Sequence, residues 1–465
     1  MKNTRVVIAL VLAILLSLGA TAAQAEGAKT ELLYTFWGSA YEKAAQEGAI
    51  AMFNEQNPDI HVEALHIPSA GTEYIAKLTA MAASGTNPDI GYMDVATAFV
   101  WAKEGKFYNI FDLMEEDPDW GPEMYVDDIF YRYEEGKSFG STSSINPRLI
   151  LYNVDAFTEA GIEPPPTTVD KSWTWDQFIE TAKLLTLDVN GKNAADPEFD
   201  PTMIMQYGVF MDCSDLVIQS ILLDSNGADL LSVDGTVMAL DAPEAVQVYQ
   251  AMYDMIYVHH VCPNPADYKA IAADIPTALK GRQAAMAITG QWVLLDMAKM
   301  GFNFDLGVMP MFKEPRNVKD AGTRVIFSNA RDKDAAWKLF KFLASPTGAL
   351  SLYKDGLWMP VLKEWYQDEE KYNTWATGPA HPASYRTVVA DSLFNGTATP
   401  SYNLRISNIN EIQTLVKAGL EPIWNNSLSG TVEDQLKATC ASAQSAVKGF
   451  NPENYHNSHY HTYKP

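Results

Sequence analysis

The most constraining feature of this sequence is a regular alternation of strand and helix patterns near its N-terminus. Residues 31–37, 60–67 and 89–93 form short apolar runs that are typical of buried strands. Between these runs, residues 41–56 and 74–83 carry apolar side chains at helical spacing. Strands that are joined through helices pair in parallel, so this pattern predicts an α/β fold.

The same alternation resumes farther along the chain. Further strands are predicted at residues 149–153 and 284–289, and further helices at residues 174–185, 242–258, 334–344 and 432–447. Ser39 and Glu42 have the spacing of a capping box, and Thr174 is a suitable N-cap. A chain of 465 residues is long enough for two large lobes, each with its own core.

The first 25 residues have the pattern of a secretory signal peptide. Lys2 and Arg5 precede an apolar run at residues 6–18, and Ala23-Gln24-Ala25 supplies a small-x-small cleavage pattern. The run is too short to span a membrane comfortably, and no cysteine follows it to carry a lipid. We therefore expect a freely soluble periplasmic protein that is not a lipoprotein and does not insert into the membrane.

Charge and cysteine content narrow the function classes. The chain has 34 basic and 58 acidic residues, a net charge of −24, which repels nucleic acids and anionic membranes. Its three cysteines are too few for a disulfide scaffold. Cys213 and Cys262 could form one bridge in an oxidising compartment, or all three, Cys440 included, could be buried small hydrophobes.

Several common catalytic and cofactor signatures are absent from the sequence. It lacks the H-E-x-x-H, P-loop and G-x-G-x-x-G patterns, so we expect no catalytic residue and no cofactor. Residues 188–191 (DVNG) lack the remaining spacing of a calcium loop, which favours a plain turn. Residues 259–262 hold two histidines and a cysteine without a second ligand pair, so no metal site is predicted.

A series of ordered motifs runs along the chain after the signal peptide. The motifs are FWGSAYE (36–42), FNEQNPDIHVE (53–63), KLTAMAASGTNPDIGYMD (77–94), LILYNVDAFTEAGIEPPPT (149–167), WTWDQF (173–178), GRQAAMAITGQW (281–292), GVMPM (307–311), DAAWKLFKFLASP (334–346) and TVEDQLK (431–437). Together they resemble the motifs of family-1 extracellular solute-binding proteins, the maltodextrin-binding-like receptors of ATP-binding-cassette importers, and the resemblance covers essentially the whole chain after the signal peptide. The histidine-rich tail at residues 451–465 matches no family motif.

The resemblance implies a two-lobe, type II clam-shell in which each lobe is a mostly parallel sheet flanked by helices. The chain would cross between the lobes three times, near residues 146–148, 323–328 and 365–371. The N-terminal lobe would then comprise residues 26–147 and 323–366, and the C-terminal lobe residues 148–322 and 367–450, followed by a polar tail. Hinge closure would bury a ligand between the lobes.

A sugar needs aromatic planes for its C–H faces and polar groups for its hydroxyls. Open α/β sheets place ligands beyond the carboxyl ends of strands, where Trp37, Asp94 and Gln291 stand in this sequence. The candidate ligand-binding residues are Trp37, Ser39, Asp94, Asn226, Gln291, Trp292, Arg324, Trp358 and Arg405, with Trp292 expected to stack on the sugar. Alternative roles are packing for Trp37 and Trp292, capping for Ser39, a turn for Asp94 and fixing an acid for Arg324.

The predicted function is a non-enzymatic, monomeric receptor that captures a sugar or oligosaccharide and delivers it to the membrane permease of an importer. The alternatives are an exported glycoside hydrolase, whose carboxyl pair the many acidic residues leave open, and a receptor for a non-sugar solute such as a glycerophosphodiester or a polyol. The absence of a basic cluster and the 11 Trp and 22 Tyr residues favour a sugar.

Overall fold

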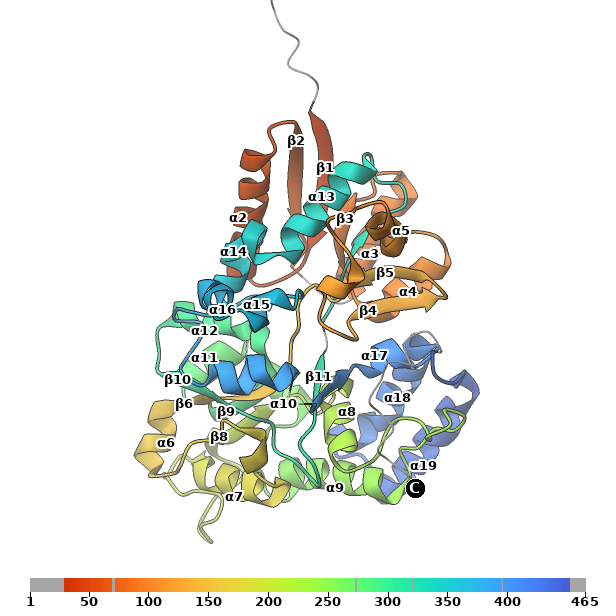
Figure 1. Cartoon of the computed structure of the whole chain (residues 1–465). Helices are drawn as coiled ribbons and strands as arrows, with labels where there is room; N and C mark the ends of the chain where they lie inside the picture. Colours follow the sequence, from red (N-terminus) through yellow and green to blue (C-terminus); the bar gives the residue numbers. More distant parts are fainter. Residues whose placement is uncertain (1–28, 69–71, 272–273, 320, 395, 452–465) are drawn as a thin grey trace, which may run out of the picture.

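The computed structural model describes residues 29–68, 72–271, 274–319, 321–394 and 396–451, and these form two lobes, one above the other in Figure 1. The predicted signal peptide and the residues after Asn451 lie outside the described part of the chain. The two-lobe α/β architecture predicted from the sequence is confirmed.

The first lobe is built on a four-stranded sheet in the order β12-β3-β1-β2. Its strands are β1 (Thr30–Phe36), β2 (Ile60–His66), β3 (Ile90–Met93) and β12 (Thr323–Ile326). Strand β1 pairs in parallel with both β2 and β3, as the alternating pattern requires, and β12 pairs antiparallel with β3. The N-terminal half of this lobe therefore follows directly from local sequence.

The second lobe contains a five-stranded sheet in the order β10-β6-β9-β8-β7. Its strands are β6 (Arg148–Asn153), β7 (Leu187–Asp188), β8 (Ile204–Met211), β9 (Ala284–Gly290) and β10 (Phe304–Gly307). Two smaller ribbons complete the described strands: β4 (Phe130–Glu134) with β5 (Lys137–Ser141), and β11 (Asn317–Lys319) with β13 (Ala398–Pro400).

Strand direction in the second lobe corrects one detail of the prediction. Only the β8–β9 pair is parallel among the neighbours described in that sheet, so this sheet is not mostly parallel. The reason is topological. Strand β6 enters from the first lobe and runs away from the boundary between the lobes, whereas β8 and β9 end at that boundary. Strand β12 enters the first lobe in the same way and opposes β3.

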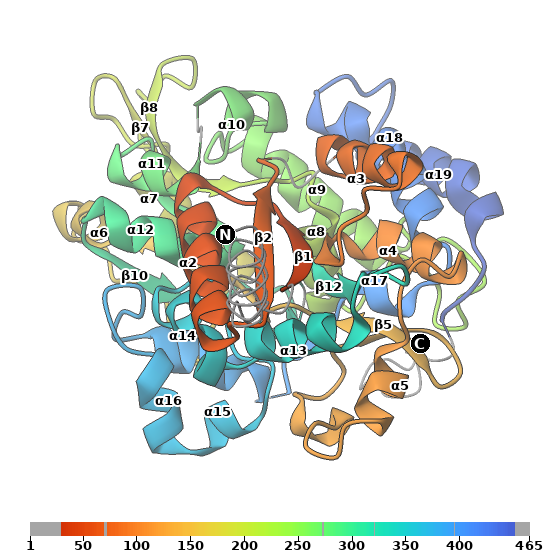
Figure 2. The same cartoon turned by 90° about the horizontal axis from the view of Figure 1, so that it is seen from above.

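Helices cover both faces of each sheet, as Figure 2 shows for the first lobe. Tyr34 of β1 donates from its hydroxyl to Gln46 of α2 (3.1 Å), while Tyr74 of α3 donates to Thr35 on the opposite face (3.1 Å). The first-lobe helices that flank the sheet are α2 (Ala40–Gln56), α3 (Thr72–Ser84), α4 (Val95–Lys103), α5 (Ile110–Glu115), α13 (Lys333–Ala344) and α14 (Pro346–Lys354).

The remaining helices lie in the second lobe or beside the boundary between the lobes. They are α6 (Val154–Ala160), α7 (Trp175–Leu185), α8 (Leu216–Ser225), α9 (Pro243–Tyr257), α10 (Pro265–Ile271), α11 (Ile275–Lys280), α12 (Leu294–Met300), α15 (Glu364–Gln367), α16 (Glu369–Trp375), α17 (Tyr402–Arg405), α18 (Ile409–Trp424) and α19 (Val432–Ala443). The predicted capping box of Ser39 and Glu42 is present, and Thr174 caps α7 with Gln177 as its partner. The last helix ends four residues earlier than predicted, because a 3₁₀ turn follows it at Gln444–Ala446.

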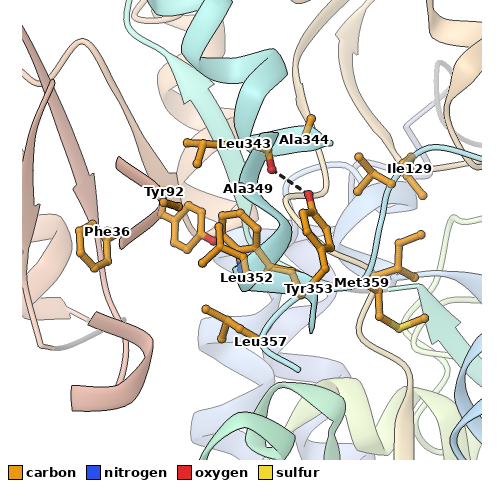
Figure 3. Packing of buried hydrophobic residues seen from close by; sticks show 14 of the residues in the cluster. Phe36, Tyr92, Ile129, Leu343, Ala344, Ala349, Leu352, Tyr353, Leu357 and Met359 are labelled. Atoms are coloured by element: carbon orange, nitrogen blue, oxygen red, sulfur yellow. Dashed lines mark hydrogen bonds between the residues drawn. The ribbon is translucent and has the colours of Figure 1, made fainter. Parts of the chain in front are cut away.

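The hydrophobic core continues from one lobe into the other. Figure 3 shows its central part, which includes Phe36 and Tyr92 of the first sheet and Leu352 and Tyr353 of α14. Residues of the second lobe, Leu294 and Leu295 among them, belong to the same cluster. The lobes are therefore packed against each other in this structure. Across the described ranges, none of the helices has the length and apolar character needed to cross a bilayer.

Candidate functional site

Strand ends from both lobes meet at the boundary between them. Trp37 and Asp94 follow the carboxyl ends of β1 and β3, Gln291 follows β9, and Arg324 lies near the start of β12. Direct contacts join the lobes here: the Ser39 hydroxyl donates to Oδ1 of Asp296 on α12 at 3.1 Å. The boundary is therefore where residues far apart in the sequence gather.

Aromatic rings form the first-lobe side of this boundary. The ring centroid of Trp37 lies 5.0 Å from that of Tyr92 and 5.1 Å from that of Tyr74. Tyr92 in turn lies 5.7 Å from Trp358. The structure thus brings the predicted residues Trp37 and Trp358 together through Tyr92, which the sequence analysis missed. Its position two residues before Asp94, at the end of the strand, was the available signal.

Arg324 is the buried cation of this aromatic group, with only 2 % of its surface exposed. Its guanidinium carbon lies 4.8 Å from the ring centroid of Trp358 and 5.7 Å from that of Phe340. Within the described chain, Nε and Nη2 of Arg324 have no hydrogen-bond acceptor. Burial raises the pKa of the neighbouring Tyr34 to about 12, although the Arg324 charge acts to lower it. Arg324 therefore keeps donors available for a bound group.

The Gln291 side chain forms hydrogen bonds with the first crossing between the lobes and with the first lobe. Its amide nitrogen donates to Oδ1 of Asn146 at 3.0 Å and to the backbone oxygen of Leu357 at 3.2 Å. The side chain is fully buried, and no described residue donates to its Oε1. An unsatisfied buried carbonyl is costly, so this oxygen is suited to accept from a ligand or from water.

Trp292 stands over Gly290 at the end of β9. A Cβ atom at position 290 would lie 1.7 Å from the Trp292 ring, so glycine is required for the ring to take this position. The guanidinium carbon of Arg148 lies 4.8 Å from the ring centroid, in a cation–π arrangement. Arg148 also approaches Asp215, with 3.8 Å between Nη2 and Oδ2. Trp292 is thus held at the second-lobe side of the boundary.

Ser39 brings two carboxyl groups into the boundary. It caps α2, and its backbone amide donates to Glu42. Burial raises the pKa of Glu42 to about 7, and the charge of Asp296 across the boundary raises it further, against the Ser39 amide bond. Burial also raises the pKa of Asp296, although the Ser39 hydroxyl bond opposes it. Neither Glu42 nor Asp296 was predicted as a site residue. The sequence pattern assigns Glu42 a capping role alone.

Three predicted residues have clear structural bonds. Asp94 caps α4 by accepting from the Thr97 amide at 2.9 Å. Asn226 is buried and donates to the Glu244 backbone oxygen at 2.7 Å. Arg405 forms a two-pronged ion pair with Asp229. The bonds of Asn226 go to α9 rather than to the boundary cluster, whereas α17, which carries Arg405, packs against α4, which begins after Asp94.

A separate cavity of about 500 Å³ lies within the first lobe. None of the nine predicted residues lines it. One of its carboxylates, Asp117, is already held by Lys341 and by the Trp337 indole N–H at 2.9 Å. Because residues of a single lobe line this cavity, lobe closure would not enclose a ligand there. The cavity is lined by Phe111, Met114, Glu115, Asp117, Pro118, Gly121, Pro122, Glu123 and Arg132.

The residues singled out for metal binding have other roles. Asp188 accepts from the backbone amides of Asn190 (2.8 Å), Lys192 (2.9 Å) and Asp200 (3.1 Å), so its carboxylate organises a turn. In the part of the chain that the structure describes, no group of three or more His, Cys, Asp or Glu side chains is arranged to hold a metal ion.

Two lobes that meet at residues following strand ends have the arrangement of binding proteins that enclose a ligand by hinge closure. Comparison with known proteins agrees. The family model described as bacterial extracellular solute-binding protein matches residues 37–350. The chain belongs to this family, as the sequence motifs indicated.

Two relatives illustrate the range of ligands. The arabinooligosaccharide-binding protein of Halalkalibacterium halodurans is 23 % identical over 332 residues, covering 68 % of this chain and 67 % of that protein. The sn-glycerol-3-phosphate-binding periplasmic protein of Pectobacterium atrosepticum is 23 % identical over 431 residues, covering 87 % and 89 %. Both are similar to this chain without sharing a ligand with each other.

A solved structure supports the fold. The ABC substrate-binding protein of Listeria monocytogenes in complex with cycloalternan superposes with a TM-score of 0.74 at 22 % identity, covering 90 % of this chain and 98 % of that one. At this identity the similarity establishes the two-lobe fold.

Proposed function

We propose that this protein is a non-enzymatic receptor that captures a sugar or oligosaccharide at the boundary between its lobes and delivers it to an ABC importer. The proposal rests on one observation: aromatic side chains and polar groups with unsatisfied hydrogen-bond donors or acceptors both lie at this boundary. Trp37, Trp358 and Trp292 supply planes, while Arg324 and Gln291 supply a donor and an acceptor. This is the combination that a sugar requires.

The transport cycle follows from the two-lobe arrangement. In an open state, water would satisfy Arg324 and Gln291. A sugar that replaces this water with fixed hydroxyls would favour the closed state, in which Ser39 and Gln291 make their bonds across the boundary. The permease would then distinguish the closed receptor from the open one. In this proposal the protein is exported by a cleavable signal peptide at residues 1–25 and acts as a monomer.

The domain boundaries belong to the same proposal. Residues 26–147 and 323–366 would move as the N-terminal lobe, and residues 148–322 and 367–450 as the C-terminal lobe. Strands β1, β2, β3 and β12 share one sheet and β6 to β10 share the other, which supports the first two boundaries. Closure would then be a rotation about the crossings near residues 146–148, 323–328 and 365–371.

A second candidate ligand is a phosphate ester, such as a glycerophosphodiester or sn-glycerol 3-phosphate. Arg324 favours it, since this buried cation has no carboxylate partner among the described residues, and an anion would neutralise it. Hydrolysis also needs a direct test, because Glu42 and Asp296 place two carboxyl groups with raised pKa values at the boundary, and glycosidases use such pairs.

The test is a titration of the chain lacking residues 1–25, followed by intrinsic tryptophan fluorescence. The panel contains mono-, di- and oligosaccharides, polyols and sn-glycerol 3-phosphate, and each mixture is analysed afterwards for hydrolysis products. We expect a saturable shift with at least one sugar and no product. A shift with the phosphate ester alone would replace the sugar by an anionic ligand, and product formation would overturn the receptor assignment.

A further inference from the structure

Two cysteines that are distant in the sequence lie together in the second lobe. Cys213 follows strand β8, and Cys262 lies between α9 and α10; each is 1 % exposed. The Val209 amide donates to the backbone oxygen of Val261 at 3.1 Å, which joins the two segments. The Cys262 thiol donates to the Met211 backbone oxygen at 3.5 Å, and the Cys213 and Cys262 side chains interact directly.

The third cysteine has a different neighbourhood. Cys440 lies on α19, and its thiol is 3.6 Å from Oδ1 of Asp241. Nothing in the described residues brings Cys440 into contact with Cys213 or Cys262. The fold therefore offers one pairing of these three side chains.

We propose that Cys213 and Cys262 form a disulfide bond in the exported protein and that Cys440 stays a free thiol. The reaction is a thiol–disulfide exchange. The two thiols lose two protons and two electrons and form one S–S bond, while the disulfide of an oxidant, a dithiol oxidoreductase or oxidised glutathione, is reduced to two thiols. The proposal rests on export, since oxidising compartments sustain such bonds, but it is independent of the ligand.

The surroundings of the pair indicate when the bond would form. The thiolate is the reactive species, and burial raises the pKa of the Cys213 thiol well above its usual range. A folded, reduced protein would therefore react slowly with an external disulfide. The bond would form while the chain folds, before β8 and the α9–α10 connection close over the sulfur atoms.

The bond would hold a turn that faces the candidate site. Directly after Cys213, Asp215 caps α8 through the Val217 amide at 2.8 Å and approaches Arg148. Arg148 in turn covers the ring of Trp292. A covalent link at residue 213 would limit movement of this turn and so help to fix Arg148 and Trp292 at the boundary.

Counting the thiols tests the proposal. The full chain is expressed with export to an oxidising compartment, denatured without reductant, alkylated with iodoacetamide and analysed by intact mass and peptide mapping. We expect a single alkylated cysteine, Cys440, and a peptide pair linked through Cys213 and Cys262. Three alkylated cysteines, or any bridge that contains Cys440, would overturn the proposal.

Stability supplies a second measurement. We expect reductant, or the Cys213→Ala/Cys262→Ala double variant, to lower Tm by about 5–10 °C, because the bond closes a long loop. The Cys440→Ser variant is the control, and its Tm should keep the same response to reductant as the wild type. Equal Tm values for the wild type with and without reductant would contradict the bond. Since neither measurement involves a sugar, their failure is distinct from failure of the proposed function.

Discussion

Two buried arginines from two regions of the molecule show how a candidate binding residue differs from a structural one. Arg324, 2 % exposed at the lobe boundary, lies against Trp358 and leaves Nε and Nη2 without acceptors in the described chain. Arg405, 4 % exposed in the second lobe, is held by both carboxylate oxygens of Asp229. Both were predicted as ligand contacts, but they differ in charge pairing: Asp229 neutralises Arg405, whereas no carboxylate among the described residues pairs with Arg324.

The comparison extends to two buried amide side chains, one in the second lobe and one at the boundary. The side-chain amide of Asn226 donates to Glu244 and to Gln247. At the boundary, by contrast, the Oε1 atom of Gln291 accepts no hydrogen bond from any described residue. Buried polar groups are normally satisfied, so unsatisfied ones gathered in one place indicate that something else binds there. The predictions below test this difference, from the largest expected effect to the smallest.

The largest effect separates the two arginines by stability. Arg405→Met should lower the free energy of unfolding by about 3 kcal/mol, because it leaves the Asp229 carboxylate partly buried and unpaired. Arg324→Met should change it by less than about 1 kcal/mol, because no carboxylate loses its partner there. Urea denaturation of both variants gives the values, and equal losses would break the comparison.

The Trp292→Ala variant tests whether the boundary residues bind the ligand. If the ring stacks on the sugar, its removal should weaken affinity by about 2 kcal/mol, or roughly 30-fold. Calorimetric titration with the sugar identified in the panel measures this. Trp120→Phe is a matched control in the first lobe, where the indole N–H donates to Tyr125 at 2.9 Å, and it should leave affinity unchanged. Unchanged affinity in Trp292→Ala would assign the ring to packing.

Glu42 makes the boundary sensitive to pH. Its pKa is raised from 4.5 to about 7, so between these values the unfolded chain releases a proton that the folded protein keeps. Stability should therefore fall as pH rises through this window, and Glu42→Gln should remove that part of the loss. At pH 5 the variant should match the wild type, and at pH 8 it should be more stable by about 2 kcal/mol.

Urea denaturation at the two pH values checks this prediction, and the difference between the proteins cancels the titration of other acids. Gln at position 42 can still accept from the Ser39 amide, so the capping box is retained. A constant difference between the variant and the wild type at both pH values would contradict a raised Glu42 pKa.

Arg324→Met also tests binding directly. Because Arg324 supplies donors that no described residue accepts from, its loss should weaken ligand affinity at least about tenfold, or about 1.4 kcal/mol. Arg405→Met, measured below its unfolding transition, should bind within about twofold of the wild type. The opposite ranking of the two variants would place the ligand at the second-lobe arginine.

The smallest effect concerns Ser39, which is both a helix cap and a link between the lobes. Ser39→Ala should cost about 1 kcal/mol of stability, the usual contribution of an N-cap. Ser39→Thr keeps the hydroxyl and should restore most of it. Thermal unfolding of the pair measures the effect, and a loss in Ser39→Thr equal to that in Ser39→Ala would show that the hydroxyl is not responsible.

The sequence allowed much of the fold to be predicted, because local patterns dictate it. The capping box at Ser39 and Glu42, the helix after Thr174 and the parallel pairing of β1 with β2 and β3 all follow from spacing along the chain. The direction of β6 does not, since it depends on where a crossing strand enters the second sheet.

The site was less predictable than the fold for the same reason. Trp37 was identified by residue type and strand position, Arg324 by its place in the second predicted crossing and Trp358 by residue type, but Tyr92 resembled an ordinary buried strand residue. Asp296 is linked to Ser39 only by the packing of α12 against the first lobe. Whether a carboxylate neutralises a buried arginine, the property that separates Arg405 from Arg324, depends on the neighbours of that arginine in space.

Hydrogen exchange followed by mass spectrometry tests the central claim most directly. The protein is exchanged with and without the sugar that the fluorescence panel identifies. The account predicts that the sugar slows exchange at residues 37–42, 290–294 and 356–359, from both lobes, and leaves residues 111–132 around the first-lobe cavity unchanged. Protection confined to residues 111–132, or to one lobe alone, would contradict a ligand site at the boundary.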